Sequence, residues 1–131
     1  MTQPRQTHAP PTAFGIVEER PQPGDVVVIG VRGELDLFTA PELRDRLRDA
    51  SDAPERAAHV VVDLSDCSFV DASGCQALLR AARLLAAQGR RLAIVNVSAG
   101  TARILNVMGL DELFPVVATR AQALAAVRAA V

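Results

Sequence analysis

The chain has 131 residues but contains no lysine, tryptophan or tyrosine, and only two cysteines and two histidines. Without lysine it can form neither a Schiff base nor a complete Walker-type phosphate loop, whose GxxxxGK[ST] pattern is also missing. Cys67 and Cys75 do not form a CxxC pair, and His8 and His59 lie in a polar segment and before an apolar run. The sequence therefore predicts no metal site, no disulfide framework and no cofactor.

Strong net charge and long apolar runs are also missing. The formal net charge is -1 and half of the residues are hydrophobic, a balance that does not favour nucleic acid or anionic lipid as a partner. No apolar run approaches the ~20 residues that a membrane-spanning helix needs. The first residues, MTQPRQTHAPPTA, do not resemble a secretory signal. We expect a cytoplasmic protein with no membrane insertion.

The apolar pattern predicts one α/β domain. Residues 1–12 are polar and proline-rich and predict a flexible tail, and residues 13–131 predict the domain. The expected strands cover 13–20, 26–31, 59–70, 92–97 and 113–117, and the expected helices 39–51, 73–88, 99–108 and 119–131. Strand–helix–strand units require parallel pairing with right-handed crossovers, so we expect a mixed central sheet with about four helices packed against it.

Capping residues set the expected helix ends. Thr39 and Glu42 form a capping-box pattern, Ser98 and Thr119 are expected caps, and Gly89 and Gly109 are expected stops. An aromatic residue directly before a cap favours a hydrophobic staple, which is the role expected of Phe38 over an exposed contact. The mixed charges of the first helix indicate a solvated face.

The stretch SFVDASGCQALL, residues 68–79, joins a strand to a helix. Asp71 or Ser73 can cap the free N–H groups of the first turn, and Gly74 lets the backbone turn without a side chain in the way. A phosphate would also be favoured there by the helix dipole. Ser73 has no GxSxG context and only His59 as a base in the folded region, so an enzyme is not expected. Cys75 fits a small core residue better than a redox sensor.

Three segments together resemble the STAS domain of bacterial anti-sigma factor antagonists. They are GELDLFTAPELRDRL (33–47), VVVDLSDCSFVDASGCQALL (60–79) and RRLAIVNVSAGTARILNVMGLDELFPV (90–116). The resemblance implies a partner-switching regulator of transcription, typically in a stress response, that binds an anti-sigma factor and so frees a sigma factor. It also implies that the anti-sigma factor is a serine kinase whose phosphorylation of the antagonist releases it, and that a phosphatase resets the system.

The family pattern at the junction is Asp, Ser, Ser or Thr, Gly, with the phosphate on the first hydroxyl residue. Asp71, Ser73 and Gly74 match this pattern, but Ala72 occupies the phosphoacceptor position. Three possibilities follow: the protein binds without being switched off, Ser73 accepts the phosphate instead, or the domain is a scaffold in a larger signalling complex. We favour the first, because a helix rotates successive side chains by ~100° and would aim Ser73 elsewhere.

The resemblance also implies where the partner binds: at the junction, on the helix after it, and on the loop expected at 33–38. The expected partner-binding residues are Glu34, Asp36, Asp71, Ala72, Ser73, Gly74 and Gln76. An accessory subunit of a phospholipid ABC transporter is the alternative, and a small-molecule sensor ranks last because only four Phe are available for stacking. The oligomeric state is expected to be a monomer or weak dimer.

Overall fold

The computed structural model describes residues 13–52 and 59–129, so the tail expected at 1–12 lies outside the described residues. Its sheet has five strands in the order β1-β2-β3-β4-β5. Their bounds are β1 Gly15–Glu19, β2 Val26–Leu35, β3 His59–Val70, β4 Leu92–Val95 and β5 Val116–Val117. β1 is antiparallel to β2 and the other pairs are parallel, which confirms the mixed sheet.

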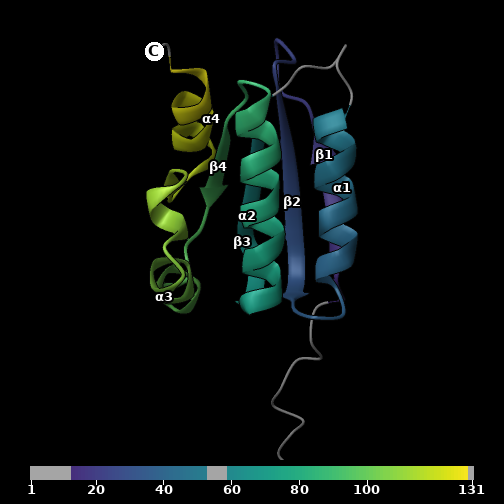
Figure 1. The fold of residues 1–131 in the computed structure, drawn as a ribbon, viewed down its shortest axis with the longest axis vertical. Helices are drawn as coiled ribbons and strands as arrows, with labels where there is room; N and C mark the ends of the chain where they lie inside the picture. Colours follow the sequence, from purple (N-terminus) through teal and green to yellow (C-terminus); the bar gives the residue numbers. More distant parts are fainter. Residues whose placement is uncertain (1–12, 53–58, 130–131) are drawn as a thin grey trace, which may run out of the picture.

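The helices lie on both faces of the sheet. They are α1 Ala40–Asp52, α2 Ala72–Ala87, α3 Ala99–Val107 and α4 Arg120–Arg128, with a 3-10 turn, η3, at Leu110–Glu112. Figure 1 shows α1 and α2 side by side in front of the sheet, with β2 in view between them. Side chains of α1, α2 and α3 share the larger core, whereas α4 packs on the opposite face. The expected β-β-α-β-α-β-α-β-α order is confirmed.

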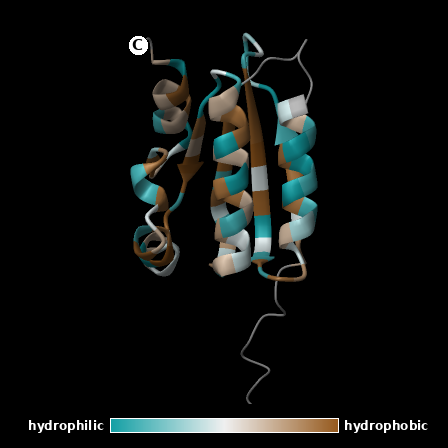
Figure 2. Ribbon diagram, viewed as in Figure 1, coloured by the Kyte–Doolittle hydropathy of each residue, from teal (hydrophilic) through white to brown (hydrophobic). Residues whose placement is uncertain are grey.

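The two cores explain the continuous apolar runs of the central strands. In β2, Val27 and Ile29 face the α1–α3 core, and Val26 and Val28 face α4; all four are 0–1% exposed. A strand covered on both faces has no position for a polar side chain, which is why these residues do not alternate. Figure 2 shows the resulting hydrophobic length of β2 behind the more polar helices.

β2 continues four residues past the end that its apolar run predicts. Leu35 lies opposite Val70, and the register shifts between Gly30 and Arg32 and again between Gly33 and Glu34. The segment Gly33–Leu35, expected as part of a loop, is therefore strand. The extension of β2 depends on its pairing with the long strand β3. This pairing is a tertiary effect that cannot be predicted from the local sequence.

Two of the expected N-caps and both of the expected helix stops are confirmed. Ser98 Oγ accepts a hydrogen bond from Thr101 N, and Thr119 forms a capping box with Gln122. Gly89 and Gly109 have φ values of 72° and 73° and follow α2 and α3. The capping box expected at Thr39 is wrong: its Oγ1 accepts a hydrogen bond from Asp36 N at 2.8 Å and donates one to the Glu34 carbonyl at 2.8 Å.

Candidate functional site

The β3–α2 junction and the β2–α1 loop meet at the carboxyl ends of two parallel strands. Asp71 N donates a hydrogen bond to the Leu35 carbonyl at 3.0 Å, which ties the start of α2 to the end of β2. The Asp71 carboxylate accepts hydrogen bonds from Ser73 N at 2.8 Å and Gly74 N at 3.1 Å. Asp71, one of the two residues expected to do so, is therefore the cap of α2, and its charge faces the helix dipole favourably.

Gly74 is needed for space and not for backbone freedom. A Cβ atom at this position would lie 2.8 Å from Leu35 Cγ and 3.1 Å from Val70 Cγ1. The missing side chain lets α2 approach the ends of β2 and β3 closely. Gly74 is itself buried, so it shapes the site through packing and presents no side chain to a partner.

Ala72 and Ser73 have different surroundings. Ala72 is exposed on the first turn of α2, whereas Ser73 is half-buried. Ser73 lines a hollow of about 160 Å³ between α1 and α2, together with Pro41, Arg44 and Gln76 among others. The position that matches the family's phosphoacceptor thus faces solvent, and its neighbour faces the groove between two helices.

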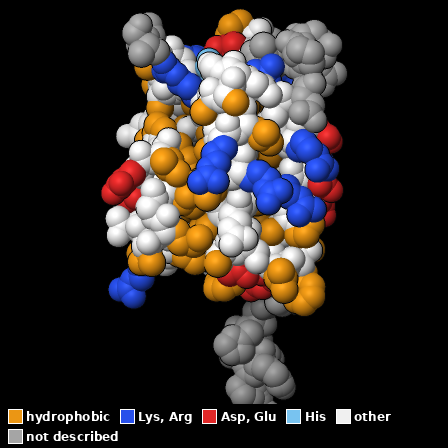
Figure 3. Space-filling view, viewed as in Figure 1, with side chains coloured by type: hydrophobic (Ala, Val, Ile, Leu, Met, Phe, Trp, Pro, Cys, Tyr) orange, Lys and Arg blue, Asp and Glu red, His pale blue; other side chains and the backbone are white. Residues whose placement is uncertain are grey.

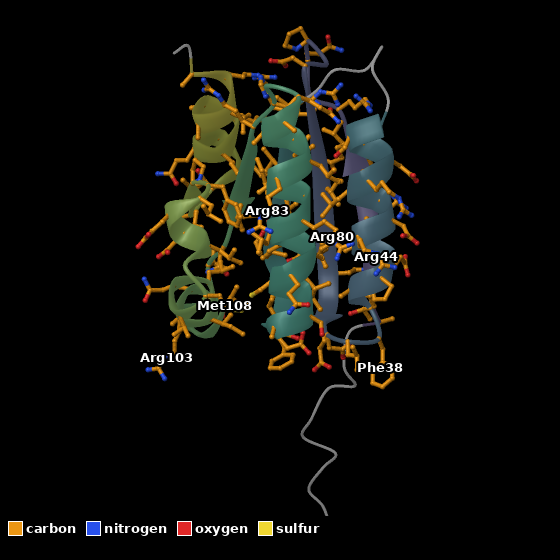
Figure 4. The ribbon with its side chains drawn as sticks, viewed as in Figure 1. Phe38, Arg44, Arg80, Arg83, Arg103 and Met108 are labelled. Atoms are coloured by element: carbon orange, nitrogen blue, oxygen red, sulfur yellow. The ribbon has the colours of Figure 1, made fainter. Side chains whose placement is uncertain are left out.

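The β2–α1 loop is shaped by Asp36. Its Oδ1 accepts hydrogen bonds from Phe38 N at 2.9 Å and Thr39 N at 3.1 Å, so the carboxylate folds the turn. The turn leaves Leu37 66% and Phe38 87% exposed. The staple expected of Phe38 is therefore wrong, and Figure 4 shows this side chain pointing away from the domain.

Apolar and acidic groups alternate over this end of the molecule. Phe69 is 49% exposed at the end of β3, and its register neighbour on β2 is the exposed Glu34. Figure 3 shows red and orange side chains together below α2. We call this the junction surface, and it consists of Glu34, Asp36, Leu37, Phe38, Phe69, Asp71, Ala72, Ser73 and Gln76.

Leu37 and Phe69 are the members that the sequence reading missed. Leu37 follows the acidic Asp36 in the sequence, just after β2, and Phe69 lies near the end of β3, two residues before Asp71. That juxtaposition is the signal that could have found them, since large apolar side chains at exposed ends mark contact sites.

The two cysteines are structural. Cys75 is fully buried, and burial, followed by the nearby Asp71 charge, raises the pKa of its thiol to about 11. Burial also raises the pKa of Cys67. A thiol needs a lowered pKa to react, so the redox role of Cys75 is not supported and its role as a small core residue is confirmed. No cluster of metal-binding side chains occurs within 13–52 and 59–129. In those same ranges, every helix is too short or too polar to cross a bilayer.

The chain is an α/β domain with a mixed sheet and a strand–helix junction between β3 and α2. A match to a family model identifies the family of this domain. Residues 19–118 match the family model described as "Mlab, STAS domain". The chain therefore belongs to the STAS domain family.

Several of the similar proteins and solved structures are anti-sigma factor antagonists. The chain is 29% identical over 103 residues to the anti-sigma-F factor antagonist RsfB of Mycobacterium tuberculosis H37Rv, covering 79% of this chain and 82% of that protein. A crystal structure of an anti-sigma factor antagonist from Mycobacterium paratuberculosis superposes with a TM-score of 0.78 at 30% identity, covering 92% of this chain and 99% of the other. Bacillus SpoIIAA in its phosphorylated form superposes with a TM-score of 0.63 at 27% identity, covering 88% and 100%.

Proposed function

We propose that this protein is an anti-sigma factor antagonist, which binds an anti-sigma factor through the junction surface and so frees a sigma factor. The similarity to relatives with that name supports the role. The observation that carries the placement is the exposed acidic and apolar surface around the start of α2, where Phe38 is almost fully exposed. A rigid scaffold that presents apolar side chains among charges suits recognition by a protein partner.

We also propose that the switch common in the family is lost at Ala72. Its methyl group has no oxygen to accept a phosphate, and it occupies the exposed position. Ser73 has a hydroxyl but lines the groove beside α1. A partner with serine kinase activity would thus bind this protein without releasing it by phosphorylation here, and a phosphatase would have no product to reset. Abundance of the protein would then set the amount of free sigma factor.

The binding test uses purified anti-sigma factors from the same genome and isothermal titration calorimetry. Asp36→Asn keeps the Oδ1 acceptor that folds the loop but removes the charge, and Glu34→Gln removes the neighbouring exposed charge. We expect the double variant to bind about tenfold more weakly, because charged groups at an interface set specificity and affinity together. The control is Glu112→Gln, an exposed glutamate on η3, outside the junction surface.

Two results would contradict the placement or the role. Equal affinity of the wild type and the double variant would move the contact away from the junction surface. Binding to the ATPase of a phospholipid ABC transporter, with no binding to any anti-sigma factor, would favour the accessory-subunit alternative.

A further inference from the structure

Four arginines line the groove between α1 and α2. Arg44 and Arg48 lie one turn apart on α1, and Arg80 and Arg83 lie on the exposed side of α2. In Figure 3 a blue band crosses the middle of this face, and in Figure 4 Arg80 and Arg44 lie over the space between the two helices. Positive charge thus gathers from two elements that are far apart in the sequence.

The groove has an apolar floor. A hollow of about 480 Å³ runs between the helices and is lined by Arg44, Leu47, Arg48, Ala77, Arg80, Ala81, Arg83 and Leu84. Arg44 and Arg80 also line the smaller hollow that contains Ser73 and Gln76, so the two hollows are adjacent. We call the larger hollow with its four arginines the arginine groove. It shares Arg44, Ala77 and Arg80 with the smaller hollow, which Ser73 and Gln76 of the junction surface also line.

The positive charge of the arginine groove is only partly neutralised. Arg44 and Arg48 share one carboxylate, that of Asp45, at 3.7 and 2.9 Å, and all three side chains are about half exposed. Arg80 and Arg83 form no ion pair with any residue that the structure describes. A chain with a net charge of -1 therefore carries a local basic site.

We propose that the arginine groove binds an acidic, amphipathic segment of the anti-sigma factor. Its carboxylates would pair with the guanidinium groups, and its apolar side chains would enter the floor around Ala77 and Ala81. This inference rests on the proposed function, because the arginine groove lies beside the junction surface, so one partner can occupy both. Guanidinium groups bind carboxylates in a two-pronged geometry, which makes such pairs directional.

The composition of the rim favours a protein segment over a dense polyanion. Exposed carboxylates of Glu42, Asp45 and Asp49 stand on the same helix as Arg44 and Arg48. They would repel a nucleic acid backbone or an anionic bilayer, which carry closely spaced negative charges. The carboxylates of a protein segment are spaced further apart and can be positioned away from these three residues. An apolar floor also suits aliphatic side chains, which inorganic phosphate does not have.

The two surfaces have opposite charge and so fix the orientation of the partner. The junction surface carries Glu34 and Asp36, and the arginine groove carries four cations. A partner that matches both must present a basic patch to the first and an acidic segment to the second, so a reversed partner would meet like charges in both places.

The groove is tested on the full chain with a defined probe. The probe is a helical peptide with glutamates flanking leucines at helical spacing, and its control has glutamine in place of glutamate. In ¹⁵N–¹H NMR titrations we expect the Glu peptide to shift amides of α1 and α2, and the Gln peptide to bind about tenfold more weakly. Arg80→Glu/Arg83→Glu should lose the binding. Arg103→Glu, an exposed arginine on α3, is the matched control and should retain it.

Several results would overturn the inference. They are equal binding of the Glu and Gln peptides, unchanged binding by Arg80→Glu/Arg83→Glu, and tighter binding of inorganic phosphate, duplex DNA or phosphatidylglycerol vesicles than of the Glu peptide. Circular dichroism of each variant checks that the fold is intact.

Calorimetry with the anti-sigma factor separates this inference from the proposed function. If the factor binds the wild type and Arg80→Glu/Arg83→Glu equally, the groove is not its docking site and the proposed function stands. If no anti-sigma factor binds but the Glu peptide occupies the groove, the proposed function is overturned and the preference of the groove for acidic segments stands.

Discussion

Ala72 and Ser73 are adjacent in the chain, but their side chains have different surroundings. Ala72 is exposed at the first turn of α2, where free N–H groups and the helix dipole favour a negative charge. Ser73 lines the hollow beside Arg44 and Gln76. The two positions differ in chemistry, since only Ser73 carries a hydroxyl group, and in exposure, since Ala72 is exposed and Ser73 is half-buried.

The first prediction concerns this pair of residues. Incubated with ATP and an anti-sigma serine kinase from the same genome, the wild type should keep its intact mass, and Ala72→Ser should gain one phosphate. Ala72→Ser combined with Ser73→Ala should gain it equally, since the new hydroxyl alone is exposed. Intact-mass spectrometry measures the change. A phosphate on the wild type that Ser73→Ala removes would show that the acceptor has moved by one residue.

At the scale of elements, α2 lies very close to the ends of β2 and β3 at Gly74. Gly74 has no side chain, so the helix lies against the side chains of Leu35 and Val70, with no room for a Cβ atom between them. At the same junction, Asp71 accepts a hydrogen bond from Ser73 N in α2 and donates one to the Leu35 carbonyl in β2. The position of the junction surface thus depends on a buried contact that no partner touches.

The second prediction tests that contact. Gly74→Ala should lower the free energy of unfolding by about 1–2 kcal/mol, because overpacking outweighs the better helix propensity of alanine. Gly100→Ala is the control, since its Cβ would meet only Ser98 Oγ at 3.8 Å. Urea unfolding measures both. A Gly74→Ala protein as stable as the wild type would mean that Leu35 and Val70 move aside at little cost.

Much of the element order can be predicted from the sequence, and the site only in part. The caps at Asp71, Ser98 and Thr119 act through neighbours two or three residues away, so a local pattern contains them. The exposure of Phe38 depends on the Asp36 turn together with an extension of β2 that β3 supports. The arginine groove depends on α1 packing beside α2. Local sequence patterns do not show how far β2 pairs with β3 or that α1 packs beside α2.

At the scale of the whole molecule, an ion-pair network joins α4, which covers the second face of the sheet, to β1 and β3. Arg120, at the start of α4, pairs with Glu19 on β1 and with Asp63 on β3, the latter at 2.6 Å. Asp63 is only 7% exposed. Burial alone would raise its pKa, but hydrogen bonds from Ser65 and Arg120 outweigh burial and hold the pKa below its ordinary value.

The third prediction follows from the sign of that shift. Because the pKa of Asp63 is lower in the folded protein than in the unfolded chain, its stabilisation is present above about pH 4 and is lost as the pH falls through the lower folded value. Arg120→Gln should cost about 1–2 kcal/mol at pH 7, less than a fully buried pair would, because Arg120 is about half exposed. The cost should shrink below pH 4.

Urea unfolding at pH 7, 5 and 3 measures this dependence, with Arg103→Gln as the exposed control. A constant difference between the wild type and Arg120→Gln at all three pH values would contradict the assignment of Asp63 as the titrating group.

The order of strands across the sheet, β1 to β5, is the order in which they are synthesised. Each strand therefore pairs with the strand that left the ribosome just before it, and none has to be inserted between two that have already paired. The sheet can grow at a single edge during translation, and α4 covers the second face after β5 has paired.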